Sequence, residues 1–218
     1  MGLKDVSTRR SILSYAKVQR IISRLIRGNP LFYRKARIKD LQHLNLGCGL
    51  HPEPALVNLD FHWVPGVDVC WDLTNPRMPF PDGRFKGVYT EHCIDGLPHH
   101  YFKPILRDLH RVLAPGGVLR MSFADGELYC DLYQKRKTDK RVAIPYGEEE
   151  ATAMVSLNRV MRHPCHTFLF DFETLALYLK EAGFSAVHRR SFRQGQDPAL
   201  LMDRPERECE SMYVEAVK

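Results

Sequence analysis

The stretch Leu44-Asn45-Leu46-Gly47-Cys48-Gly49 decides the fold, because a short apolar run ends there in a Gly-x-Gly turn. Such a turn directly after a strand lets a ligand approach the backbone closely. A nicotinamide dinucleotide site would require a third glycine where this chain has Pro52, and an acid about 20 residues further on. The first acid at a strand end, Asp60, follows Gly49 by only eleven residues. A nicotinamide cofactor is therefore the poorer fit.

Outward from this turn, strand and helix signals alternate along the chain. Two further apolar runs, residues 55–59 and 67–71, end at or just before the acids Asp60 and Asp72. A helical stripe over residues 105–113 follows the fourth strand signal and precedes the next one. Alternation of this kind predicts an α/β domain whose mainly parallel sheet has helices on both faces.

The composition is typical of a soluble globular domain. Of the 218 residues, 44% are hydrophobic and 27% are charged, and no apolar run reaches the length of a bilayer crossing. The first residues show no secretory signal, and the six cysteines are scattered without a Cys-x-x-Cys pair. We therefore expect reduced cysteines and a cytoplasmic protein.

Residues 1–40 are predicted to form a separate basic arm ahead of a domain over residues 41–218. The arm holds eleven Lys or Arg and two Asp, a net charge of +9, whereas the remainder holds 21 basic and 24 acidic residues, a net charge of −3. Apolar residues recur in the arm at helical spacing, with arginines on the other face; they are Ile12, Val18, Ile22 and Leu25. This amphipathic helix either packs on the domain, as a core element or lid, or lies in a membrane interface with its arginines on anionic lipid. The second alternative would place the protein peripherally at the inner face of the membrane.

Further motifs follow the Gly-x-Gly turn in a fixed order. They are Val57-Asn58-Leu59-Asp60, Val69-Cys70-Trp71-Asp72-Leu73, Pro79-Phe80-Pro81-Asp82-Gly83-Arg84-Phe85, Tyr89-Thr90-Glu91-His92 and Leu109-His110-Arg111-Val112-Leu113-Ala114-Pro115-Gly116-Gly117. In order and spacing, this set resembles class I S-adenosylmethionine-dependent methyltransferases, particularly the branch with the generic small-molecule methyltransferase domain. The resemblance covers residues 41–125 and, more loosely, 166–218. It implies a Rossmann-like sheet of seven strands, mostly parallel with an antiparallel last strand, and S-adenosylmethionine as the cofactor.

The resemblance also implies which residues meet the cofactor. The turn Gly47-Cys48-Gly49 would bring backbone amides to the methionine carboxylate, and Asp60 would accept hydrogen bonds from both ribose hydroxyls. Asp72 would bind the adenine amino group, with Leu73 packed on the ring. Glu91 would follow the fourth strand at the carboxyl edge of the sheet, where ligands gather in such folds.

Two features depart from the family pattern. Asn45, counted among the cofactor residues, stands where the family has an acid, which removes one negative charge near the cofactor's ammonium and sulfonium. About ten residues separate the first two strand signals, fewer than a crossover usually needs, so we expect a shortened helix or a loop around Pro52 and Pro54. Branches with such a short crossover resemble enzymes of surface-glycan pathways. Residues 126–165 are expected to form an insertion or lid over the active site.

Methyl transfer from a sulfonium depends chiefly on in-line placement of the acceptor and on exclusion of water. An oxygen or nitrogen acceptor can also need a base with a pKa near 7, which suits histidine. His92 is the first candidate and His166 the second, with a structural role as the alternative for each. The run His163-Pro164-Cys165-His166 lacks a partner pair of ligands, so we expect no metal site.

Three functions are compatible with these patterns. The first is methylation of a small-molecule acceptor or of a glycan- or lipid-linked one. The second is RNA methylation with the basic arm as a nucleic-acid grip, which is less favoured because Thr90-Glu91-His92-Cys93 replaces the Asn/Asp-Pro-Pro-Tyr motif of amino-directed enzymes. The third is a non-catalytic module that binds the cofactor and acts through partners.

Overall fold

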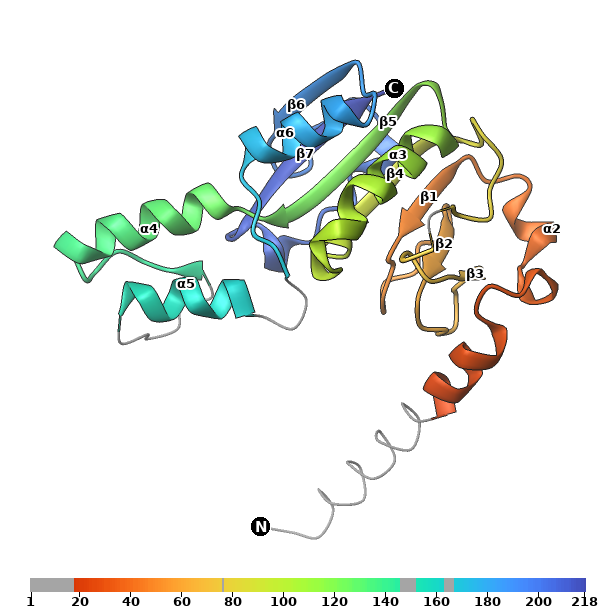
Figure 1. Cartoon of the computed structure of the whole chain (residues 1–218), viewed down its shortest axis with the longest axis horizontal. Coiled ribbons are helices and arrows are strands. Elements are labelled where there is room, and N and C mark those ends of the chain that lie inside the picture. The colour runs from red at the N-terminus through yellow and green to blue at the C-terminus, as the bar shows by residue number, and fades with distance from the viewer. Residues whose placement is uncertain (1–17, 76, 146–151, 163–166) are drawn as a thin grey trace, which may run out of the picture.

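The structure is a computed structural model that describes residues 18–75, 77–145, 152–162 and 167–218. Within these residues, one sheet has the strand order β3-β2-β1-β4-β5-β7-β6 (Figure 1). The strands are β1 (His43–Leu46), β2 (Val57–Asp60), β3 (Val69–Cys70), β4 (Phe85–Glu91), β5 (Leu113–Ala124), β6 (Ala186–Arg190) and β7 (Ser211–Val217). Every pairing is parallel except the two made by β7. The predicted Rossmann-like sheet, mostly parallel with an antiparallel last strand, is confirmed.

Helices connect and flank these strands. They are α2 (Lys35–Ile38), α3 (Phe102–Val112), α4 (Gly126–Thr138), α5 (Ala153–Arg162) and α6 (Phe172–Glu181), together with a helical segment over residues 18–26. Asp171 caps the N-terminus of α6, because its side chain accepts a hydrogen bond from the Thr174 amide at 2.8 Å. Asp125 caps α4 in the same way, through the amides of Glu127 and Leu128. Short 3-10 turns occur at η1 (Pro30–Phe32), η2 (Ile94–Gly96), η3 (His99–Tyr101), η5 (Pro198–Leu200) and η6 (Pro205–Arg207).

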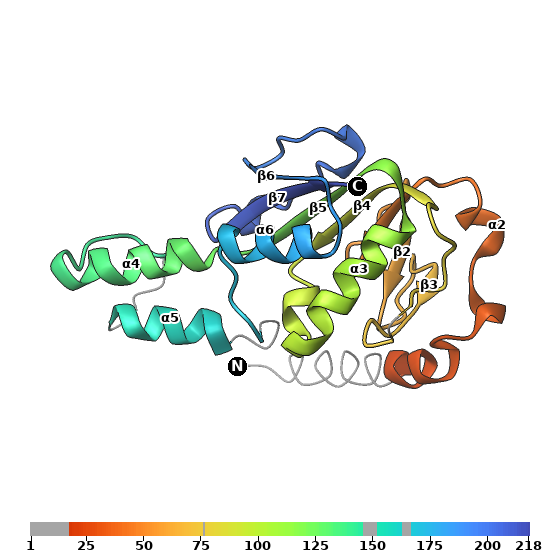
Figure 2. The ribbon, with the colours of Figure 1, turned by 45° about the horizontal axis from the view of Figure 1, so that its top comes forward.

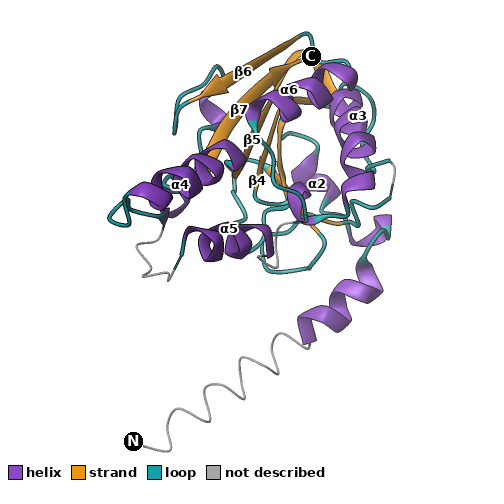
Figure 3. Ribbon diagram, turned by 60° about the vertical axis from the view of Figure 1, so that its left-hand side comes forward, coloured by secondary structure: helices purple, strands orange, loops and turns teal. Residues whose placement is uncertain are grey.

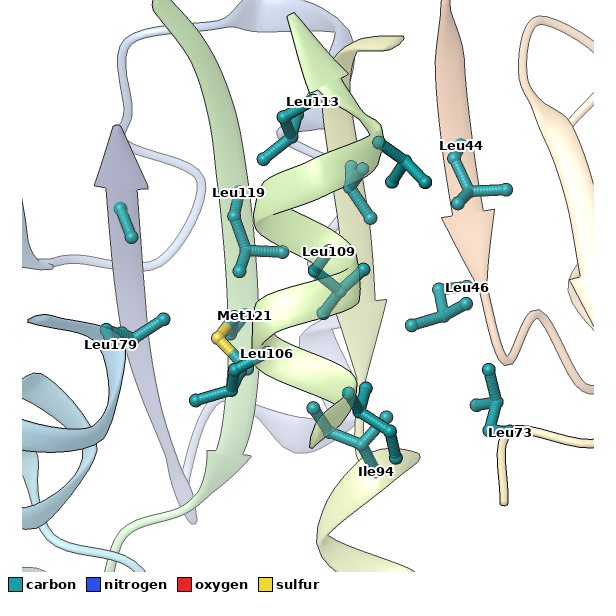
Figure 4. Close-up of a cluster of buried hydrophobic side chains, with 14 of the residues drawn as sticks. Leu44, Leu46, Leu73, Ile94, Leu106, Leu109, Leu113, Leu119, Met121 and Leu179 are labelled. Atoms are coloured by element: carbon teal, nitrogen blue, oxygen red, sulfur yellow. The ribbon is translucent and has the colours of Figure 1, made fainter. Parts of the chain in front are cut away.

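The first face of the sheet is apolar and is covered by α3 and α6 (Figure 2). Its strand residues are fully buried; they include Leu44, Leu46, Val57, Leu59, Val88, Leu119, Met121 and Val214. Leu106 and Leu109 of α3 pack on β5, and Leu179 of α6 completes the cluster (Figure 4). Side chains alternate along a strand, so these residues occupy every second position. This cluster is the main hydrophobic core.

The second face of the sheet is polar, because the intervening strand positions carry Asn45, Asn58, Arg120 and Glu215. The connection between β6 and β7, residues 191–210, crosses over this face with its turns η5 and η6. Its Leu200 packs against Leu56, Tyr89 and Val118 in a small second cluster. Arg120 is fully buried there, and its Nε donates to Asp203 Oδ1 at 2.8 Å while Nη1 donates to Glu215 Oε1 at 3.3 Å.

Beyond β5 the chain forms the pair of helices α4 and α5, which lie side by side and project from the body (Figures 1 and 3). They occupy most of the described part of residues 126–165, for which the role of a lid stays a prediction. In the ranges that the structure describes, no helix has both the length and the apolar character that a membrane crossing needs.

Candidate cofactor and acceptor site

The predicted cofactor residues lie at or near the carboxyl ends of β1, β2, β3 and β4, which share one edge of the sheet because these strands are parallel. Gly47-Cys48-Gly49 follows β1, Asp60 ends β2, and Asp72 comes two residues after β3. The first two are in direct contact, since the Gly49 amide donates to Asp60 Oδ2 at 2.8 Å. The fold therefore places the Gly-x-Gly turn in contact with Asp60, which the sequence analysis had related to the turn only through the family pattern.

Both glycines of the turn have backbone conformations that favour glycine, with φ of 71° at Gly47 and 54° at Gly49. A Cβ at Gly47 would also overlap the side chain of Cys93, which follows β4. At Gly49 a Cβ would meet no atom within 4 Å. Gly47 thus packs the turn against the end of β4, whereas Gly49 faces open space that a ligand can fill.

The backbone amides of the turn were expected to bind the methionine carboxylate, but they donate to acceptors within the protein. Those of Gly47 and Cys48 donate to the Leu59 carbonyl at 2.8 and 3.3 Å, and that of Gly49 donates to Asp60. In this conformation none of the three is available to a methionine carboxylate. The Gly47 carbonyl accepts no hydrogen bond from any described residue, so it can accept one from the cofactor's ammonium group. The turn fits the methionine end of the cofactor through this carbonyl.

Asp60 has the geometry of a ribose ligand. Its Oδ1 accepts from the His62 amide at 2.7 Å and its Oδ2 from Gly49, which fixes the carboxylate while each oxygen keeps a further lone pair. Asp72 accepts from the Thr74 amide and hydroxyl through Oδ1 alone; within the described residues its Oδ2 has no partner. Leu73 lies beside Leu46 at this edge (Figure 4) and is 9% exposed. These residues fit S-adenosylmethionine.

The side chain of Asn45 stabilises the loop that connects β1 to β2. Its Nδ2 donates to the His51 carbonyl and to Asn58 Oδ1, both at 3.1 Å. Asn58 in turn binds Glu53, accepting from its amide at 2.7 Å and donating to its carbonyl at 2.9 Å. Residues 47–56 contain no helix, which confirms the expected loop. Because both Nδ2 protons of Asn45 are used within the protein, this side chain supports the cofactor turn rather than offering a donor to a ligand.

Glu91 ends β4 and His92 follows it, and their side chains have different partners. The Glu91 carboxylate binds the side chain of Arg204 and accepts from its backbone amide at 3.2 Å, so it is held by the connection over the second face. His92 has a φ of 44°, an uncommon conformation for a residue other than glycine that often marks a functional site. Its Nε2 lies 2.8 Å from Ser211 Oγ at the start of β7. His166 lies outside the described residues.

Two buried acids near His92 were missed by the sequence analysis. Asp95, in η2, is 3% exposed, and burial followed by the nearby charge of Glu210 raises its pKa to about 8. Glu210 is also buried and accepts from Arg207 at 2.6 Å and from the Tyr129 hydroxyl at 3.2 Å. The sequence signal for Asp95 was its place three residues after His92; Glu210 precedes β7 and gave no local signal.

The two cysteines at the site are neutral thiols. Burial, then the charge of Asp60, raises the pKa of Cys48 to about 12. The same two causes raise the pKa of Cys93 far above its ordinary value. Since the thiolate is the reactive form, neither residue is suited to nucleophilic catalysis.

Comparisons with known proteins agree with this geometry. Residues 44–121 match the family model of a methyltransferase domain. No curated protein sequence matches the chain significantly. A SAM-dependent methyltransferase from Archaeoglobus fulgidus has a similar structure, with a TM-score of 0.53 and 16% identity over 94% of this chain and 93% of that one. A second similar structure is a SAM-dependent methyltransferase, possible histamine N-methyltransferase, from Thermotoga maritima, with a TM-score of 0.50 and 16% identity over 84% of each chain.

The strand order is that of a Rossmann-like methyltransferase fold, and residues 44–121 match a methyltransferase domain. Together they indicate an S-adenosylmethionine-dependent methyltransferase, with S-adenosylmethionine as its methyl donor. The sequence-based predictions of family, enzyme class and cofactor are confirmed.

Proposed function

We propose that the protein methylates a hydroxyl-bearing small acceptor, such as a sugar unit that is free or carried on a lipid. The observation that carries this proposal is His92, which follows β4 at the carboxyl edge of the sheet with a φ of 44° and with its Nε2 2.8 Å from Ser211 Oγ. A hydroxyl group loses a proton when its oxygen takes a methyl group, and a histidine at this edge is suited to accept that proton. An apolar acceptor would offer no such proton.

The cofactor residues have separate roles in the proposal. Asp60 binds the ribose hydroxyls, Asp72 binds the adenine amino group through Oδ2, and the Gly47 carbonyl accepts from the ammonium group. When bound, S-adenosylmethionine supplies a methyl group on a sulfonium, which is an excellent leaving group. The protein then contributes mainly position and the exclusion of water.

His92 is the proposed base for the acceptor hydroxyl. Ser211 fixes the orientation of its ring through Nε2, and the amide of His92 donates to the Ser122 carbonyl at 2.9 Å. The end of β4 is thereby attached to both β5 and β7. A ring oriented at this edge of the sheet is placed to accept the proton of a bound hydroxyl, which is the role of a general base.

The test is methyl transfer from labelled S-adenosylmethionine to a panel of saccharides, nucleotide sugars, polyprenyl-linked sugars, small amines and an RNA transcript. We expect transfer to a sugar hydroxyl, and we expect His92→Ala to lower turnover about 100-fold with unchanged affinity for S-adenosylhomocysteine. His188→Ala, which removes an exposed histidine on β6, is the matched control. Transfer only to RNA or amines would overturn the acceptor class, and full turnover of His92→Ala would overturn the role of the base.

A further inference from the structure

The helical segment over residues 18–26 presents an apolar surface to solvent. Val18, Ile21 and Leu25 are 52%, 59% and 71% exposed. Consecutive residues of an α-helix are about 100° apart around its axis, so these three side chains fall within a sector of about 60°. They form one continuous apolar strip, which we call the outer strip.

The opposite side of the same helix is fixed to the domain by polar contacts. Ser23 is fully buried, and its Oγ accepts from the Trp63 amide at 2.8 Å. Arg27 donates to the Phe61 carbonyl at 3.0 Å, and the Gly28 amide donates to the Cys70 carbonyl at 2.9 Å. The helix is therefore held with the outer strip facing away from the core. Of the two alternatives for this helix, Val18 and Leu25 do not follow the one in which they pack on the domain, because the buried Ser23 and its partner Trp63 set the rotation of the helix.

The charge around the outer strip has one sign. Residues 18–39 contain seven Arg or Lys and no Asp or Glu. Arg20 and Arg24 are exposed on the same helix, on a sector separate from the outer strip. Leu31 and Phe32, in the turn that follows, are 85% and 55% exposed and add apolar area. Exposed apolar side chains flanked by arginines without acids match the surface of an anionic bilayer, with its acyl boundary and its phosphates.

We propose that the outer strip, together with Leu31 and Phe32, docks on an anionic lipid bilayer. The segments that hold the helix, at Phe61 and Cys70, directly adjoin Asp60 and the residues leading to Asp72. Docking therefore brings the cofactor edge of the sheet close to the lipid headgroups. This inference concerns the arm alone and does not depend on which acceptor is methylated.

The experiment is co-sedimentation of the full-length protein with vesicles of phosphatidylcholine, either alone or with 30% phosphatidylserine. We expect binding only to the anionic vesicles, and Leu25→Ser should weaken it about fivefold or more through lost apolar contact. Val18→Ser, Ile21→Ser and Leu25→Ser combined should abolish it. Leu177→Ser, at an exposed leucine of α6, is the matched control and should bind as the native protein does.

The contribution of charge needs its own control. Arg20→Gln with Arg24→Gln should reduce vesicle binding about tenfold, whereas Lys137→Gln with Lys140→Gln, which changes the net charge equally in and after α4, should not. The proposal is overturned if the intact protein ignores anionic vesicles at low salt. It is also overturned if the triple substitution leaves vesicle binding unchanged. A third contrary result is that the triple substitution converts a dimer into a monomer in light scattering, because the outer strip would then contact a second copy of the chain.

Discussion

Replacing Asn45 by aspartate distinguishes support of the crossover loop from direct contact with the cofactor. The family pattern has an acid here, so a cofactor role would make the substitution neutral or favourable for binding. The structure instead places both Nδ2 protons of Asn45 on acceptors, His51 O and Asn58 Oδ1. A carboxylate at this position would face two oxygen atoms and would have no proton to offer them.

The size of the effect follows from the burial of the site. Asn45 is 5% exposed and Asn58 is 1% exposed, so water cannot replace the lost donors. The His51 carbonyl would lose its donor, at a cost of about 1–3 kcal/mol, whereas Asn58 Oδ1 would keep the Glu53 amide. The buried charge of the aspartate beside these two oxygens adds to this cost, so we expect Asn45→Asp to lower the free energy of unfolding by about 3–5 kcal/mol. At about 2–4 °C per kcal/mol for a chain of this length, the melting temperature should fall by roughly 10 °C.

Thermal melts of Asn45→Asp across pH 5 to 8 measure this effect. Burial raises the pKa of an aspartate, and its protonated form can donate one hydrogen bond, so the defect should shrink toward pH 5 and grow as the pH rises. Asn158→Asp, on α5, introduces the same charge outside the core and should change the melting temperature little. An Asn45→Asp protein that is fully stable at pH 8 and binds S-adenosylmethionine more tightly would refute the reasoning.

Two further predictions concern acids at the site. Asp60→Asn should weaken S-adenosylhomocysteine binding in calorimetry at least about tenfold, because charge-assisted hydrogen bonds to the ribose are lost, while Asp139→Asn should leave it unchanged; equal affinity in both would remove Asp60 from the ribose. Asp95 has a folded-state pKa of about 8, above its unfolded value, so the folded state holds a proton that the unfolded state releases. Its contribution to stability is therefore complete below pH 4 and is lost as the pH rises toward 8, by at most about 1.4 kcal/mol per pH unit. Asp95→Asn should remove that slope in urea titrations at pH 5.5, 7 and 8.5, and a slope identical to that of the native protein would show that Asp95 is ionised in the fold.

The first face of the sheet and the cofactor turn could be predicted because their signals are local. Gly47 and Gly49 are required by backbone conformations within the turn, and Asp60 follows directly from the end of an apolar strand. The apolar stripe predicted over residues 105–113 includes Leu106 and Leu109, which lie on α3 and pack in the core. In each case the residues that decide the structure are within a few positions of one another.

The second face could not be predicted in the same way, because its contacts join distant residues. Arg120 binds Asp203 and Glu215, which are 83 and 95 positions further along the chain. The same is true of the arm, whose rotation depends on Ser23 and Trp63, 40 positions apart. A helical pattern shows that a helix has an apolar side, but a single distant hydrogen bond decides whether that side is buried.

The polarity of the second face follows from the short crossover. A helix satisfies its own backbone carbonyls, whereas a loop packed on a sheet needs donors from its surroundings. Asn45 supplies one to the loop over residues 47–56, and Arg120 supplies others to the carbonyls of Gln194 and Ser191 in the β6–β7 connection, at 2.9 and 3.3 Å. Strands that helices cover on both faces are apolar almost throughout. Here loops cover the second face, so the strand positions on that face can hold polar side chains that donate to the loops. In Leu44-Asn45-Leu46, the two leucines therefore face the side of the strand that helices cover, and the asparagine faces the side that loops cover.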